Sequence, residues 1–265
     1  MMDKMILGRY IPSNSWLHLA DPRAKLTSVM AFIIIVFFAN NWLTYGFLFL
    51  FVLSLVVLSK VPVIFFLKGL QPIFFLITLT LLLQLFFTQG GHTLVSFGFI
   101  HITTLGLKNG IMIFCRFVLI VLMTTILTLT TNPIQLTDGL EKILAPFRVV
   151  RLPVHELALM LSISLRFIPT LMDETEKISK AQKARGVDFT SGSIKERIKA
   201  IIPLLVPLFI SAFKRAEDLA IAMEARGYHG GHGRTRYRQL RWQWGDTWLM
   251  ISLGVLLALL LVFRS

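Results

Sequence analysis

Two copies of the pattern Ala-x-x-Ala-Arg-Gly are the residues of this chain best suited to recognising a partner. The first copy runs from Ala181 to Gly186 and the second from Ala222 to Gly227. Four fixed residues recur by chance at on the order of 1 in 10⁵ positions, so two copies indicate a repeated feature. An arginine donates paired hydrogen bonds to a carboxylate, and neighbouring alanines leave the surface beside it smooth.

Each copy closes a stretch of good helix formers, DETEKISKAQKAR at 173–185 and KRAEDLAIAMEAR at 214–226. Glycine after such a stretch favours a left-handed helix end, and arginine in the last turn offsets the negative end of the helix dipole. One copy alone is explained by a well-capped helix end, whereas two favour docking into two similar carboxylate-bearing grooves. The predicted docking residues are Ala184, Arg185, Gly186, Ala225, Arg226 and Gly227, with Ala181 and Ala222 as supporting positions on the helix face.

The composition indicates that these helices belong to a membrane protein. Hydrophobic residues make up 55% of the 265, charged residues only 15%, and the mean hydropathy is +0.72. The net charge of +13 could also suggest nucleic acid, as could the basic and aromatic stretch RTRYRQLRWQW at 234–244. That stretch directly precedes an apolar run, where arginine and tryptophan anchor a helix at the membrane surface. We therefore expect a lipid bilayer as a partner and no nucleic acid.

Five segments are apolar over nearly the 20 residues that a membrane crossing needs. Lysine and arginine number four in the N-terminal tail, none in 89–105 and eighteen in 132–243. Because cytoplasmic loops are enriched in these residues, the distribution predicts a multi-pass protein of the bacterial cell membrane with a cytoplasmic N-terminus. The predicted spans are 24–41, 43–59, 70–88, 110–131 and 244–263.

Two shorter apolar runs, 157–165 and 200–213, lie inside the basic segment. If both crossed the membrane, seven positive charges in 173–199 would lie outside, so we interpret the runs as helices against the cytoplasmic face. The fold class is therefore all-α, about five transmembrane helices plus a cytoplasmic-facing helical platform. The expected regions are 1–131 for the tail and first four spans, 132–243 for the platform, and 244–265 for the last span.

Motifs of catalysis and metal binding are absent from the sequence. It contains no G-x-x-x-x-G-K-[ST] phosphate loop, no H-E-x-x-H and no G-x-S-x-G, so we expect no enzyme activity and no bound cofactor or metal. His229-Gly-Gly-His232 is interpreted as a loop rather than a zinc site. Arg116 is the one cation well inside an apolar run. It is a candidate functional residue, but pairing with a helix carbonyl or extension toward lipid headgroups is the favoured interpretation.

The chain resembles the transmembrane (T) components of energy-coupling factor transporters, which are ATP-driven importers of micronutrients. The resemblance rests on GRYIPSNSWLHLADPRAKL at 8–26, with Asp21-Pro22-Arg23-x-Lys25, and on the two Ala-Arg-Gly motifs. It implies that the motifs cap long coupling helices, each fitting a groove on one of two ATP-binding-cassette ATPase subunits, expected as a heterodimer. Arg185 and Arg226 would pair with acidic residues there, while the ATPases hold ATP and magnesium.

The resemblance also implies a separate substrate-binding membrane protein, the S component, which the coupling helices would reorient. A T component shared among several vitamin S components is favoured over one dedicated to cobalt, nickel or biotin. A membrane-embedded lipid-modifying enzyme is the alternative from another class. It would need a catalytic cluster, and the acidic group Asp173, Glu174 and Glu176 is more simply a solvated helix face.

Overall fold

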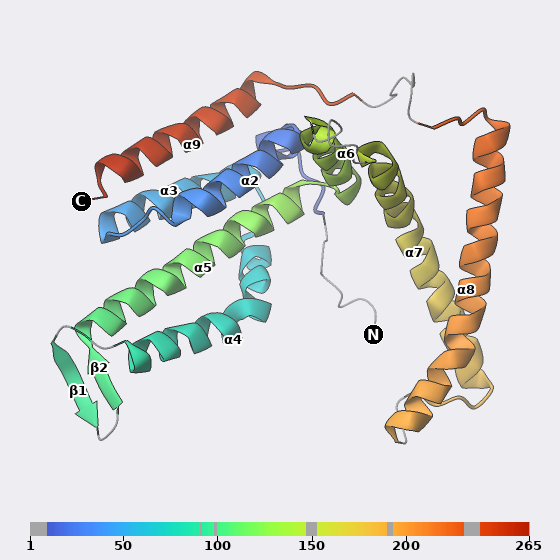
Figure 1. Cartoon of the computed structure of the whole chain (residues 1–265), viewed down its shortest axis with the longest axis horizontal. Coiled ribbons are helices and arrows are strands. Elements are labelled where there is room, and N and C mark those ends of the chain that lie inside the picture. The colour runs from blue at the N-terminus through green and yellow to red at the C-terminus, as the bar shows by residue number, and fades with distance from the viewer. Residues whose placement is uncertain are drawn as a thin grey trace. The chain divides into compact units, whose positions relative to one another are not determined.

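The regular structure of the described residues consists of helices and one short hairpin (Figure 1). The computed structural model describes residues 10–88, 90, 92–97, 100–146, 153–189, 193–230 and 239–264. The prediction of an all-α membrane protein is confirmed, and the antiparallel hairpin is a local addition in the loop between two long helices. The helices are α1 (Trp16–Leu19), α2 (Pro22–Val36), α3 (Trp42–Ser59), α4 (Val63–Phe87), α5 (Thr104–Thr130), α6 (Pro133–Leu144), α7 (Val154–Ala184), α8 (Ile194–Ala225) and α9 (Trp244–Val262), and the strands are β1 (Thr93–Phe97) and β2 (Ile100–Thr103).

The chain divides into two compact units. Unit 1 comprises residues 1–143 and 239–265, and unit 2 comprises residues 144–238. Unit 1 therefore contains α1 to α5, most of α6, the hairpin and α9, whereas unit 2 contains α7 and α8. The expected boundaries at 131 and 243 remain predictions, since a division by internal contacts does not mark where the chain enters or leaves a membrane.

Five described helices are long and apolar enough to cross a membrane: α3, α4, α5, α7 and α9. The predicted number of spans, five, is right, but one of the predicted segments is not among these helices and another helix is. The span expected at 24–41 corresponds to α2, which has only 15 residues. Such a helix rises about 22 Å, less than the ~30 Å hydrocarbon layer. The apolar residues continue past Val36 in the sequence, but the backbone turns there and α3 begins after Asn41.

Helix α7 is the additional candidate span, because it is continuous for 31 residues, through Arg166 and Pro169. The apolar run 157–165, which by itself is too short to cross a membrane, is thus only part of a longer helix. Length and composition alone qualify α7 as a span, and the prediction that it lies against the cytoplasmic face stays a prediction.

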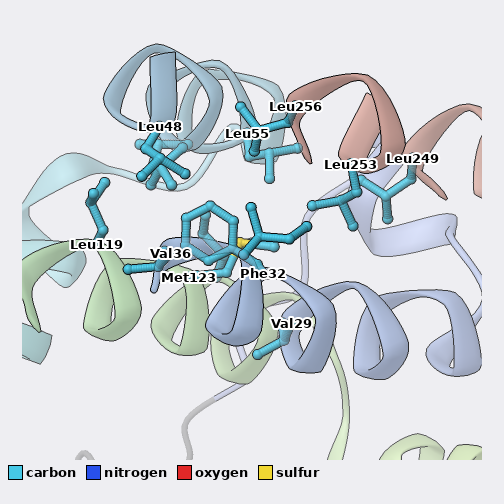
Figure 2. Packing of buried hydrophobic residues seen from close by; sticks show 14 of the residues in the cluster. Val29, Phe32, Val36, Leu48, Leu55, Leu119, Met123, Leu249, Leu253 and Leu256 are labelled. Atoms are coloured by element: carbon cyan, nitrogen blue, oxygen red, sulfur yellow. The ribbon is translucent and has the colours of Figure 1, made fainter. Parts of the chain in front are cut away.

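The core of unit 1 lies among α2, α3, α5 and α9 (Figure 2). Phe32 of α2, Leu48 of α3, Leu119 of α5 and Leu260 of α9 are each fully buried. Helix α4 packs along α5 and buries little of its own surface, Phe66 and Ile77 being its buried residues. The apolar surface that α4 leaves uncovered suits contact with lipid.

One end of this bundle is held by buried polar groups. Asp246, fully buried in the first turn of α9, accepts hydrogen bonds from the backbone N–H groups of Asp21 and Gln243, both at 2.8 Å. Lys25 Nζ donates to Thr130 O at 3.1 Å and Thr131 Oγ1 at 3.3 Å, at the C-terminal end of α5. The phrase Asp21-Pro22-Arg23-x-Lys25 thus joins the beginnings of α2 and α9 to the end of α5.

Candidate partner-docking site

Helix α7 ends as its Ala-Arg-Gly motif predicts. Arg185 is the last helix-like residue, and Gly186 adopts the left-handed φ of +87°. The Gly186 N–H donates to Lys183 O and the Val187 N–H to Gln182 O, both at 3.0 Å. These two bonds satisfy carbonyls that a helix end otherwise leaves unpaired, and they require the left-handed residue between them.

Helix α8 ends in the same way. Gly227 has a φ of +73° and its N–H donates to Glu224 O at 2.8 Å. The Tyr228 N–H donates to Met223 O at 3.0 Å. The two helix ends are therefore equivalent in backbone geometry as well as in sequence, and each presents its arginine at the tip.

All eight residues predicted for docking are exposed. The alanines of each copy, three residues apart, lie on one face of their helix, and the arginine follows at the end. Within the described part of the chain, no carboxylate forms an ion pair with Arg185 or Arg226. Two exposed guanidinium groups beside smooth alanine surfaces are available to a carboxylate on another molecule. The structure brings each triad together locally, and the binding of a partner there stays a prediction.

Helices α7 and α8 cross as an antiparallel pair (Figure 1). Arg215 Nη2 of α8 and Glu174 Oε2 of α7 form an ion pair at 2.7 Å. These residues are 41 positions apart, the same offset that separates Arg185 from Arg226. The ion pair therefore joins equivalent positions of the two repeats, as expected where two similar helices cross about a local two-fold axis.

The crossing lies at the same distance from both tips. Arg185 follows Glu174 by 11 residues (185 − 174), and Arg226 follows Arg215 by 11 (226 − 215). At 1.5 Å per residue, each arginine is about 16 Å along its helix from the crossing. The two helix ends are thus arms of equal length on opposite sides of one ion-paired contact.

A second contact between the helices involves a residue of the motif itself. Pro207 lacks an N–H group, so the carbonyl of Pro203, four residues earlier in α8, loses its usual helix donor. Gln182 Nε2 of α7 donates to that carbonyl at 3.4 Å. The variable glutamine of the first Ala-x-x-Ala-Arg-Gly thus joins α7 to α8 where α8 is weakened by proline.

Gln182 and Arg215 are not among the residues predicted from the sequence. Glu174 is predicted to belong to a solvated helix face, whereas the structure pairs its carboxylate with Arg215. The signal was present in the repeat, because the 41-residue offset that aligns the motifs also aligns position 174 with position 215. Opposite charges at equivalent positions indicate a contact between the two copies.

The remaining candidates from the sequence are the histidine pair, the basic and aromatic stretch, and Arg116. His229 is exposed, and His232 lies outside the described residues, so the interpretation of that pair as a loop stays a prediction. Residues 234–238 of the stretch 234–244 also lie outside them, whereas Trp242 and Trp244 are exposed at the beginning of α9. Arg116 does contact a carbonyl, since its Nη2 donates to Ala39 O at 3.4 Å.

The long apolar helices define a multi-pass membrane protein, and its paired helix ends form a surface suited to a partner. Residues 13–237 match the protein family described as cobalt transport protein (CbiQ). The energy-coupling factor transporter transmembrane protein EcfT of Listeria innocua is 77% identical over 265 residues, 100% of both chains. The EcfT proteins of Bacillus subtilis and Lactococcus lactis are 57% and 54% identical, over 100% of this chain and 100% and 99% of theirs. The chain therefore belongs to the family of transmembrane components of energy-coupling factor transporters.

Proposed function

We propose that the chain is the non-catalytic coupling subunit of an ATP-driven importer. It docks two ATP-binding-cassette ATPase subunits, expected as a heterodimer, through the ends of α7 and α8. It transmits the ATP-driven movement of these subunits to a substrate-binding S component in the membrane. ATP and magnesium are bound by the ATPases, and the names of the relatives, transmembrane proteins of a transporter, support a subunit without its own catalysis.

The observation that carries this proposal is the equivalence of the two helix ends. Each has the same glycine-closed backbone, the same exposed Ala-Arg-Gly triad, and an arginine 11 residues from the Glu174–Arg215 ion pair. A dimer of homologous ATPases offers two similar grooves, and a carboxylate in each would pair with Arg185 or Arg226. Such a charge-assisted, two-bonded pair fixes orientation as well as affinity.

The crossing contacts suit the transmission of movement. The ion pair and the Gln182–Pro203 hydrogen bond hold α7 and α8 together at two levels, so displacement of either tip turns the pair as one body. Both helices expose apolar side chains along their length, including Met160 and Ile168 of α7 and Phe209 of α8. These apolar faces are the surface that we assign to the S component.

Charge reversal at both tips tests the docking. The Arg185→Glu and Arg226→Glu double variant is expected to insert in the membrane but to lose co-purification of the ATPases, because each groove carboxylate would face another carboxylate. Either single reversal should leave partial binding, since one tip remains intact. Recovery of ATPase subunits in a mild-detergent pull-down is the measurement.

A matched control reverses two exposed cations that lie away from the tips. Lys177 is exposed on α7 and Lys214 on α8, so Lys177→Glu with Lys214→Glu changes net charge by the same amount. ATPase recovery should stay near the wild-type level. Docking through the tips is excluded if the tip variant retains normal recovery, or if both double variants lose it equally.

The same pull-down distinguishes shared from dedicated use. We propose that this chain serves several vitamin S components, because the full-length relatives carry a general transporter name. Several S components identified by mass with one T component would support sharing. A single S component under all vitamin limitations would instead support dedicated use.

A further inference from the structure

Arg116 of α5 has no counter-charge in its part of the sequence. No aspartate or glutamate occurs at positions 22–137 or 247–265, which include α2, α3, α4 and α5 entirely and nearly all of α9. The Arg116 side chain nevertheless lies partly buried inside a helix that is apolar enough to span a membrane. A cation in such surroundings is costly unless an anion or enough acceptors satisfy it.

The contacts that Arg116 makes leave it incompletely satisfied. Its Nη2 donates to Ala39 O at 3.4 Å, and the guanidinium carbon lies 5.0 Å from the centre of the Phe37 ring. Its Nε is buried and has no hydrogen-bond partner among the described residues. A carbonyl and an aromatic ring thus hold the guanidinium in place without neutralising it.

A buried tyrosine lies beside it. Tyr45 of α3 is only 4% exposed, and its hydroxyl is buried. The guanidinium of Arg116 lies beside this hydroxyl, whose oxygen faces it as a hydrogen-bond acceptor. A neutral hydroxyl can hold the guanidinium from the buried side but leaves its charge uncompensated, and a ligand with negatively charged oxygens would supply that missing charge.

The surroundings of this pair have the character of a membrane–water interface. The α2–α3 turn and the C-terminal end of α9 lie at the same end of unit 1 (Figure 1). Exposed aromatic side chains gather there, including Phe37, Trp42 and Phe263. The guanidinium of Arg264, after α9, lies 5.8 Å from the Phe38 ring and adds a second cation. Aromatic rings with arginines are typical of the headgroup level.

We propose that Arg116 binds the phosphate of an anionic phospholipid at this end of unit 1, with Tyr45 holding the guanidinium from the buried side and Arg264 adding to the positive potential. The headgroup phosphate supplies the missing acceptors and charge, while the acyl chains lie along the exposed apolar faces of neighbouring spans. A free phosphate would lose its hydration without burying acyl chains. The site goes beyond the transport function, since it concerns how the membrane lipid stabilises this subunit.

Lipid retention by the full chain tests the site. The protein is purified in detergent, supplied with phosphatidylglycerol or phosphatidylcholine, and examined by native mass spectrometry. We expect the wild type to retain phosphatidylglycerol preferentially, and Arg116→Gln to weaken this retention about tenfold through loss of charge-assisted hydrogen bonds. Tyr45→Phe should weaken it by a smaller factor, because it removes a neutral contact of the guanidinium and leaves the charge of Arg116 in place.

Lys108→Gln is the matched control, because Lys108 is an exposed cation two turns earlier in α5. It should leave the preference unchanged, and an equal loss in both variants would reduce the effect to net charge and overturn the site. Competition by millimolar inorganic phosphate would indicate a free anion instead of a lipid. Equal retention of both lipids by the wild type would also overturn the proposal and leave water or a partner's carboxylate as the acceptor.

Discussion

At the scale of single residues, the buried polar groups at the beginning of α2 and α9 determine how the bundle ends. Lys25 is 4% exposed and Asp246 fully buried, and each is bound by groups from other elements. Because removing one member of a buried polar network leaves the others unsatisfied, these residues allow little substitution. They lie at the end of α5, where the chain continues into α6.

His18 belongs to the same region and makes stability depend on pH. Its ring bridges the Ser15 hydroxyl at 2.6 Å and the Ile11 carbonyl at 3.0 Å. Burial lowers the pKa of His18, against the opposing effect of the Ile11 carbonyl and with a further lowering by Lys25. The folded state therefore binds this proton less readily than the unfolded chain, and stability is lost as pH falls below about 6.5.

His18→Gln keeps a donor and an acceptor but does not titrate, so it should flatten the fall in melting temperature between pH 7 and pH 5. The quantity compared between variant and wild type is the slope of melting temperature against pH. A loss of stability that is the same at every pH does not change this slope. Thermal unfolding in detergent at a series of pH values measures it. His229→Gln, at an exposed histidine, should keep the wild-type slope. Identical slopes for His18→Gln and the wild type would contradict the assignment.

At the scale of helices, local signals were readable from the sequence and distant contacts were not. The glycine-closed ends of α7 and α8 follow from short-range preferences, and both occur as predicted. The end of α2 was missed because hydropathy counts Phe37 and Phe38 as a continuing span. The interlocking bonds of Asn41 and Thr44, which begin α3, reveal the break. The Glu174–Arg215 ion pair depends on how α7 crosses α8, and no short segment of sequence contains both residues.

Gly186→Ala and Gly227→Ala test the helix ends. An alanine at φ near +80° is strained by about 1 kcal/mol, although no described atom lies within 4 Å of the added Cβ. The cost is therefore local: the closing hydrogen bonds weaken and the amides of Val187 and Tyr228 should exchange about fivefold faster. Hydrogen exchange read by mass spectrometry measures this, and ATPase recovery should fall with it.

Gly254→Ala in α9 provides the comparison, since its Cβ also meets open space among the described residues but its backbone is helical. It should be neutral or slightly stabilising. Unchanged exchange in both tip variants would show that the left-handed glycines do not hold the helix ends.

At the scale of the whole molecule, the chain leaves unit 1 after Ile143 and returns to it at Gln239. Unit 2 is thus an insertion that consists mainly of α7 and α8, and both of its ends are tied to helices of unit 1. The proposed function requires unit 2 to pass movement from the ATPases to the S component. The contacts between α7 and α8 decide whether the pair moves as one body or as two separate helices.

The Glu174–Arg215 ion pair tests this transmission apart from docking. Its side chains are 22% and 35% exposed, so its contribution to stability should be below about 1 kcal/mol. Glu174→Arg or Arg215→Glu alone places like charges at the crossing, and should leave ATPase docking and ATP hydrolysis intact while lowering substrate uptake per ATP in proteoliposomes. The combined variant restores opposite charges with their positions exchanged, and should recover much of the coupling.

Lys180→Gln, which removes an exposed ion pair with Glu176 within α7 alone, should couple normally. Full coupling in both single variants would show that α7 and α8 transmit movement without this contact, whereas uncoupling in the swapped double variant would show that more than charge is needed there.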